Sequence, residues 1–184
     1  MFFEASISYA AVSFSMNNDS TGSMFIGTPN SSLYDPNTLQ TYNVLDQNQL
    51  IMALFNIEIG NIALGYNGRI QFMINSPYSV VPKAVFDVVT QVLPIGNYTV
   101  ASMDSVFVAK FDCNNLPVTM PNITYSIQGD PLVLQPYQYI LGSGTNCSLA
   151  FAYLNSTTSD KFGFDFTFGY TIMYNQFMII DYSH

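Results

Sequence analysis

The stretch CNNLPVTMPNITYSI, Cys113 to Ile127, joins a cysteine, two prolines and a short segment with the composition of a β-strand. Residues 123–127 are β-branched, aromatic or small and follow Pro121 and Asn122, residues that bound strands. The stretch therefore predicts a β-strand at residues 123–127.

Comparable segments recur along the chain and predict a mostly β domain. The predicted strands are residues 11–16, 23–26, 50–59, 106–111, 123–127 and 177–181. In the third, alternation places Asn56 and Glu58 on one face, before a Gly60-Asn61 turn. The same alternation places Phe55, Ile57 and Ile59 together on the other, buried face.

One helix is predicted between Pro82 and Pro94. Pro82 suits a first helical position, Pro94 stops the helix, and the apolar residues between them recur at helical spacing. Those apolar residues are Val85, Phe86, Val88, Val89, Val92 and Leu93. With no internal repeat or linker in the sequence, residues 1–184 are expected to form one domain.

Composition excludes several kinds of partner. Of 184 residues, 49% are hydrophobic and 9% charged, and the formal net charge is −8. The four basic residues, Arg69, Lys83, Lys110 and Lys161, are too few to follow a phosphate backbone, so nucleic acid is not expected as a partner. No apolar run reaches the ~18 residues of a spanning helix. Residues 1–16 lack the features of a signal peptide, so we expect Met1 to lie inside a longer precursor.

Glycosylation signals and cysteines point to the secretory pathway. Six N-x-[ST] sequons occur, at Asn18, Asn30, Asn97, Asn122, Asn146 and Asn155. The two cysteines, Cys113 and Cys147, are either a disulfide or buried free thiols, and a secretory location favours the disulfide. A bridge would close a loop of about 35 residues and stabilise the fold by about 4 kcal/mol. We expect a secreted or lysosomal glycoprotein.

Several segments, in chain order, resemble the C-terminal lobe of pepsin-like (peptidase A1, cathepsin D and pepsin) aspartic peptidases. Residues 120–125 resemble the family's L-P-x-I-T-F, residues 132–140 resemble F-x-L-x-P-x-x-Y-V, and Ala150-Phe151 follow Cys147 as in C-x-x-G-F. Residues 166–170 resemble W-I-L-G-D, and residues 14–34 resemble an earlier strand region. The resemblance implies a single pepsin-like lobe, mostly β with one or two short helices, whose N-terminal lobe lies outside this chain.

The resemblance also implies where a catalytic aspartate would stand. Each lobe of these enzymes supplies one Asp from a hydrophobic-hydrophobic-Asp-[Thr/Ser]-Gly motif, and the two carboxylates share a proton. That motif falls on Phe72-Met73-Ile74-Asn75-Ser76. Met73 takes the place of the acid, Ile74 that of the hydroxyl residue and Asn75 that of the glycine, while Ser76 alone keeps family chemistry. A thioether has no exchangeable proton, so we expect no catalytic residue here.

No other arrangement in the sequence replaces the lost acid. Asp104 in Met103-Asp104-Ser105-Val106 comes nearest to the hydrophobic-Asp-Ser part of the catalytic motif, but Val106 stands where the turn needs glycine. Asp165 and Asp181 are read as surface or capping residues. With His184 the only histidine, no Ser-His-Asp site, metal site or cofactor motif is expected.

These observations favour a non-catalytic peptidase homologue that binds or assembles with other molecules. Its first expected partner is a pepsin-like N-terminal lobe, in the same precursor or on a separate chain. Other subunits of a secreted assembly are a second class of candidate partner. Two alternatives stay open. The chain could be one lobe of an active endopeptidase completed by another lobe or chain, or an unrelated extracellular β-sandwich adhesion module.

Overall fold

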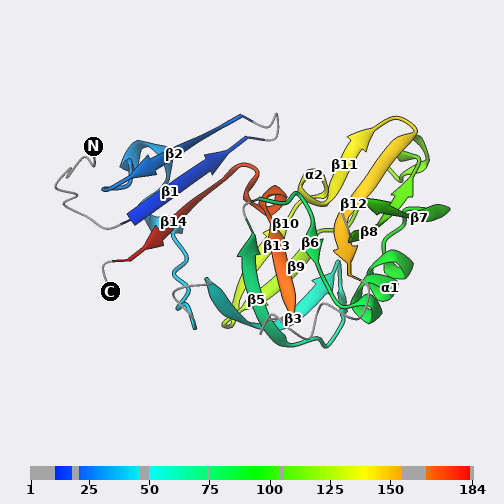
Figure 1. The fold of residues 1–184 in the computed structure, drawn as a ribbon, viewed down its shortest axis with the longest axis horizontal. Coiled ribbons are helices and arrows are strands. Elements are labelled where there is room, and N and C mark those ends of the chain that lie inside the picture. The colour runs from blue at the N-terminus through cyan, green and yellow to red at the C-terminus, as the bar shows by residue number, and fades with distance from the viewer. Residues whose placement is uncertain are drawn as a thin grey trace. The chain divides into compact units, whose positions relative to one another are not determined.

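The computed structural model describes residues 11–17, 21–45, 50–73, 75–103, 106–154 and 165–182, and Figure 1 shows their fold. These residues form two units. The smaller takes its chain from residues 1–41 and 173–184, and the larger from residues 42–172. Each is described by itself.

The smaller unit is a three-stranded antiparallel sheet in the order β14-β1-β2. Its strands are β1 (Ala11–Met16), β2 (Gly22–Ile26) and β14 (Gln176–Asp181). Two single 3-10 turns, η1 (Ser31–Leu33) and η2 (Pro36–Thr38), follow β2. Tyr34, between them, stacks on Phe177 of β14 with ring centroids 5.1 Å apart. Through this contact the segment after β2 packs on the sheet.

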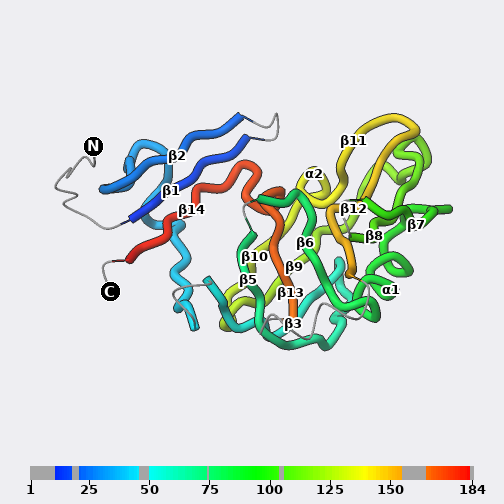
Figure 2. The backbone as a smooth tube through the Cα atoms, viewed as in Figure 1, coloured from blue at the N-terminus to red at the C-terminus, as the bar shows by residue number. Residues whose placement is uncertain are grey.

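The larger unit contains two sheets. In the first, the strand order is β10-β9-β3-β5-β13, and β4 pairs with β3. The bounds are β3 (Ile51–Ile59), β4 (Ile62–Ala63), β5 (Gly68–Met73), β9 (Ile123–Ile127), β10 (Asp130–Leu134) and β13 (Phe166–Gly169). Neighbouring strands are antiparallel except β5 and β13, which run parallel. That parallel pair joins segments almost 100 residues apart in sequence. Figure 2 shows the two segments side by side in clearly different colours.

The second sheet of the larger unit has the order β11-β12-β8-β7, with β6 paired to β12. Its strands are β6 (Ser79–Val80), β7 (Tyr98–Met103), β8 (Val106–Phe111), β11 (Ile140–Ser143) and β12 (Asn146–Tyr153). The remaining elements are α1 (Lys83–Val92), α2 (Pro136–Tyr139), η3 (Cys113–Asn115) and η5 (Tyr170–Met173). Helix α1 packs beside β12.

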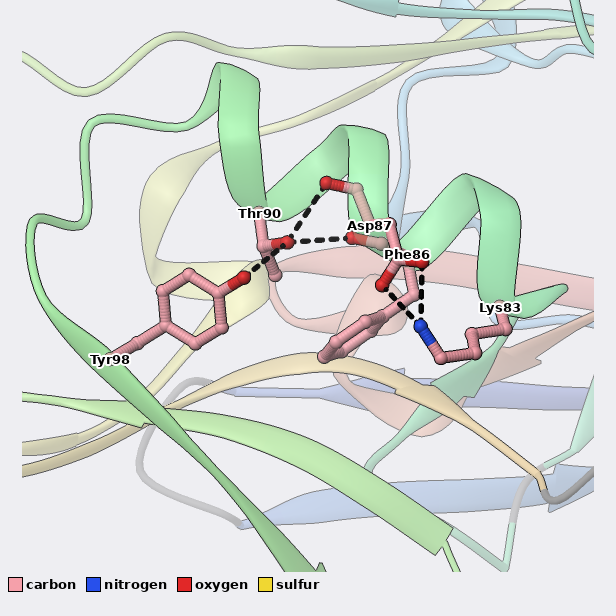
Figure 3. A network of polar contacts seen from close by, with 5 residues as sticks. All are labelled: Lys83, Phe86, Asp87, Thr90 and Tyr98. Atoms are coloured by element: carbon pink, nitrogen blue, oxygen red, sulfur yellow. Dashed lines mark hydrogen bonds and ion pairs between the residues drawn. The ribbon is translucent and has the colours of Figure 1, made fainter.

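Helix α1 is held to the second sheet by apolar packing and by a chain of hydroxyl groups. Val85, Phe86 and Val89 are buried. The Tyr98 hydroxyl of β7 donates to Thr90 Oγ1 at 3.1 Å, and the Thr90 hydroxyl lies 3.0 Å from the Phe86 carbonyl oxygen (Figure 3). The helix therefore lies on the face of the sheet toward which Tyr98 points.

Most of the predicted elements are confirmed. Strands β1, β8 and β9 have the predicted bounds, β2, β3 and β14 differ by one residue at one end, and α1 occupies the predicted helix. Gly60-Asn61 forms the turn between β3 and β4, with φ of 58° at Gly60. In the described part of the chain, the helices are too short to cross a membrane.

The predicted side of Phe55 is wrong. Its side chain is 56% exposed, whereas Ile57 and Ile59 are buried. The pairing of β3 with β9 shifts register between Leu54 and Asn56, so one extra residue interrupts the alternation at Phe55. Side chains therefore do not alternate strictly between the two faces of the sheet along the whole of β3.

Candidate functional site

The segment that follows β5 approaches the end of β13 at backbone distance. We call residues 73–80 the β5 loop; Ile74 lies outside the described residues. Met73, the last residue of β5, is the register partner of Gly169, the last residue of β13. A Cβ atom at Gly169 would lie 2.6 Å from the carbonyl carbon and oxygen of Pro77. Only glycine allows this approach without displacing the loop.

Hydrogen bonds to main-chain carbonyl oxygens of the β5 loop join it to the residues after β13. The Tyr170 N–H donates to the Ser76 carbonyl oxygen at 2.8 Å, and the Thr171 hydroxyl donates to the Pro77 carbonyl oxygen at 3.0 Å. Thr171 is fully buried, so this bond satisfies a group that water cannot reach.

Two further hydroxyl groups join β6, at the end of the β5 loop, to β13. Ser79 Oγ accepts from the Gly169 N–H at 3.0 Å, and Thr167 Oγ1 accepts from the Val80 N–H at 2.8 Å. β13 therefore lies between β5 and β6, and it links the two sheets of the larger unit because β6 also pairs with β12. The loop backbone is held on both sides.

The β5 loop carries no carboxyl, amino, imidazole or thiol group. Its one ionisable side chain is the phenol of Tyr78, which is buried with its hydroxyl 3.5 Å from Met103 Sδ. Met73 is half-buried, and Asn75 is exposed. Ser76 Oγ accepts from the Tyr78 N–H at 3.1 Å and so supports the turn. A thioether, an amide and an alcohol without a neighbouring base cannot exchange a proton near neutral pH, so these three side chains offer no acid–base chemistry.

An aromatic cluster lies at the carboxyl ends of β5 and β13. Phe168 of β13 contacts Phe72 at a centroid distance of 5.2 Å and Tyr125 of β9 edge-on at 4.7 Å. The Tyr125 hydroxyl is buried and has no hydrogen-bond partner among the described residues, and burial raises the pKa of Tyr125. An unpartnered buried hydroxyl destabilises the folded state, and it is accommodated here among apolar rings.

The described carboxylates away from the loop have local structural contacts. Asp35, Asp112 and Asp165 accept from the N–H groups of Asn37, Asn114 and Arg69, respectively. Asp165 thereby fixes the start of β5, in agreement with its reading as a capping residue. Asp181 ends β14 at an exposed position, and Asp104 lies outside the described residues.

Two other carboxylates affect neighbouring groups. Asp87 pairs with Lys83 on α1 at 2.6 Å, and this hydrogen bond raises the pKa of Lys83. Burial, with a smaller contribution from Asp130, raises the pKa of Tyr42. Among the described residues, no three His, Cys, Asp or Glu side chains come together as metal ligands. His184, the only histidine, is outside the described ranges.

The predicted disulfide is confirmed. Cys113 and Cys147 are bonded, with Cα atoms 5.8 Å apart and a sequence separation of 34. The bridge ties η3, which follows β8, to the start of β12. The Cys113 N–H also donates to the Gly144 carbonyl oxygen at 2.8 Å. Backbone and disulfide together fix this end of the second sheet.

Four of the six sequons fall on described residues, and all four asparagines are exposed: Asn30, Asn97, Asn122 and Asn146. Asn30 Oδ1 accepts from the Ser32 N–H at 3.1 Å and from the Ser32 hydroxyl at 2.8 Å, which orders that sequon as a turn. Asn18 and Asn155 lie outside the described residues. Glycosylation stays a prediction.

Sequence reasoning missed the hydroxyl groups that hold the β5 loop, at Ser79, Thr167 and Thr171. Single hydroxyl residues are common in strands and turns, so their types carry little information. The informative signal was Gly169, the glycine that ends the apolar run of β13, since a glycine in a strand marks close approach of another backbone.

Comparison with known proteins identifies the fold of this chain but not its activity. No family model matches this sequence, and no curated protein matches it. The structure is similar to the crystal structure of an aspartic proteinase from Irpex lacteus, with a TM-score of 0.70 and 14% sequence identity. The alignment covers 98% of this chain and 56% of that one, so this chain spans little more than half of its neighbour's length. The chain has a mostly β, pepsin-like aspartic proteinase fold.

Proposed function

We propose that this chain is a non-catalytic lobe of pepsin-like fold that acts as a binding or structural glycoprotein in the secretory pathway. The observation that carries the proposal is the β5 loop. Its backbone is held by Gly169, Tyr170 and Thr171, yet Met73, Asn75 and Ser76 offer no group that could activate water.

The smaller unit supports a partner for this lobe. On its sheet, residues opposite each other point to the same side, so seven apolar side chains share one face: Val12, Phe14, Met16, Met24, Ile26, Met178 and Ile180. Met24 and Ile26, on the edge strand β2, are 60% and 65% exposed. Contiguous apolar faces are typical of protein interaction surfaces. The proposed partner is a pepsin-like N-terminal lobe, in the same precursor or on a separate chain, within a secreted assembly.

The proposed compartment rests on the disulfide and the exposed sequons. Disulfides persist in oxidising compartments, and N-glycans are added only in the secretory pathway. Cys113–Cys147 is bridged, and four sequon asparagines are accessible. These features support an extracellular or lysosomal location.

The principal alternative is an active endopeptidase in which another lobe completes the site. It lacks support from the β5 loop, because a lone aspartate from the other lobe would have no carboxylate with which to share its proton. An immunoglobulin-like sandwich, the second alternative, accounts for neither helix α1 nor the likeness to an aspartic proteinase.

The proposal is tested on the protein purified from its native source. After removal of N-glycans, intact-mass analysis is expected to show a polypeptide longer than the 20.5 kDa chain, or a second chain that copurifies. No pepstatin-sensitive cleavage of a denatured protein substrate is expected between pH 3 and 7. Pepstatin-sensitive cleavage that Asp104→Asn abolishes would establish the alternative.

A further inference from the structure

A shallow groove of about 410 Å³ lies on the β7-β8-β12 part of the second sheet, with Asn97, Thr99, Lys110, Thr145 and Asn146 among its lining residues. Lys110 on the central strand β8 is directly opposite Thr99 on β7 and Ser148 on β12. Directly opposite residues lie on the same face of a sheet, so Lys110 stands between two hydroxyl side chains.

The orientation of Tyr98 places this group on the face away from α1. The Tyr98 hydroxyl reaches Thr90 of α1 (Figure 3), and successive side chains of a strand point to opposite faces. Thr99 and its partner Lys110 therefore point away from the helix. Asn146, two residues before Ser148 on β12, belongs to the same face.

Lys110 differs from the other described basic residues. Lys83 is paired with Asp87, and Arg69 is exposed to solvent. Lys110 is half-buried, and in the described ranges no hydrogen bond or ion pair satisfies its ammonium group. An ammonium group without a counter-ion in the protein is available to an anion from solution.

The surroundings of Lys110 supply hydrogen-bond donors rather than a carboxylate. The residues that line the groove include no Asp or Glu. The nearest acid along β8 is Asp112, whose Oδ1 already accepts from the Asn114 N–H at 2.8 Å. Hydroxyl and amide groups around one ammonium match the acceptor oxygens of a carboxylate or sulfate group.

We propose that this groove binds a small oxyanion, a carboxylate or sulfate, through the Lys110 ammonium group and the Thr99 hydroxyl group. The net charge of −8 repels long polyanions, so the ligand is a single acidic group, either a free ion or the acidic substituent of one sugar. Asn97 and Asn146 belong to sequons, so an N-glycan at either residue stands beside the groove. This site is independent of whether the lobe takes part in catalysis.

The test is a titration of the full chain, with N-glycans trimmed, at constant ionic strength, followed by amide NMR. Sulfate, glucuronate and neutral methyl glucoside are the three probes. Sulfate and glucuronate are expected to give saturable shifts at Thr99, Lys110 and Asn146, and the glucoside none. Tighter binding of sulfate identifies a free ion as the ligand, and tighter binding of glucuronate identifies an acidic sugar.

Variants separate binding from folding. Lys110→Gln is expected to weaken binding at least about tenfold, since hydrogen bonds to charged groups contribute about 1.5–3 kcal/mol. Lys110→Arg retains the charge and is expected to stay within about threefold of the parent. Asp112→Asn keeps the capping oxygen, removes a nearby negative charge and is expected to tighten binding about twofold.

The matched control is Arg69→Gln, which also removes one positive charge but lies on β5, in the other sheet. It is expected to bind as the parent does. Absence of saturable shifts with both anions, equal binding by Lys110→Gln, or equal binding of the neutral glucoside would overturn the proposal.

Discussion

The disulfide end of the second sheet and the β5 loop are both held firmly in place, but by different kinds of contact. Around Cys113–Cys147, the bridge and the bond from Cys113 to Gly144 fix two strands. Around Met73, hydrogen bonds to the main chain and the absence of a side chain at Gly169 fix the loop. The side chains of the loop include no carboxylate. The difference shows that hydrogen bonds and close backbone packing can hold a loop of this fold in place without a covalent cross-link.

The largest expected effect concerns the disulfide end. Cys113→Ser combined with Cys147→Ser should lower the free energy of unfolding by about 4 kcal/mol, because the unfolded chain gains the entropy of a long open loop. Urea unfolding of the double variant and the parent measures this difference. A loss below about 1 kcal/mol would mean that backbone contacts alone hold this end.

The next effect concerns the β5 loop. Gly169→Ala should destabilise the protein by about 2–3 kcal/mol, because the new Cβ would meet the Pro77 carbonyl group at 2.6 Å. Gly96→Ala is the matched control: its added Cβ has no neighbour within 4 Å, and its φ of 68° should cost only about 1 kcal/mol. Equal losses in the two variants would refute the close approach of β13 and the loop.

A pair of buried tyrosines gives effects of opposite sign. Tyr125→Phe removes a buried hydroxyl without a partner and should stabilise the fold by about 1 kcal/mol. Tyr139→Phe removes a hydroxyl that donates to the Pro121 carbonyl oxygen at 2.5 Å and should destabilise it by about 1 kcal/mol. Thermal unfolding at pH 7 measures both, and destabilisation by Tyr125→Phe would contradict the absence of a partner.

The same two tyrosines predict loss of stability in alkali. Burial raises the pKa of both phenols in the folded state, so the folded protein retains protons that the unfolded chain releases. Their contribution is complete below the unfolded pKa of about 10 and is lost as pH rises above it. Unfolding measured from pH 8 to 11 should show this decline, and Tyr125→Phe should make it shallower.

The smallest effect is expected at Met73 itself. Met73→Leu preserves apolar volume at a half-buried position and should change stability by less than about 1.5 kcal/mol. It should also leave any binding activity of the purified assembly unchanged. A large loss of binding, with unfolding unaltered, would give the thioether a role beyond packing.

Much of the fold could be predicted because its signals are local. Strand β9 and helix α1 are bounded by proline or asparagine and have a composition or period of their own. The chain has two cysteines, so one intramolecular disulfide was possible, and the secretory signals favoured that disulfide over free thiols. At the candidate site, the sequence alone shows that position 73 carries no acid, but it does not show that Met73 lies beside β13.

What could not be predicted depends on pairing between distant segments. The exposure of Phe55 follows from a register shift against β9. The contact of Met73 with Gly169 and the bonds of Thr167 and Thr171 exist only because β13 returns beside β5. The Lys110 groove likewise needs three strands in register, and no local pattern announces it.

The central claim, that the β5 loop keeps its fold without catalytic chemistry, is tested most directly by peptide hydrolysis. The purified native assembly would be compared at pH 3 to 7, with and without pepstatin, with the same assembly carrying Met73→Asp, Ile74→Thr and Asn75→Gly. The account predicts that the unmodified assembly is indistinguishable from a buffer blank. Pepstatin-sensitive turnover by the unmodified assembly would contradict it.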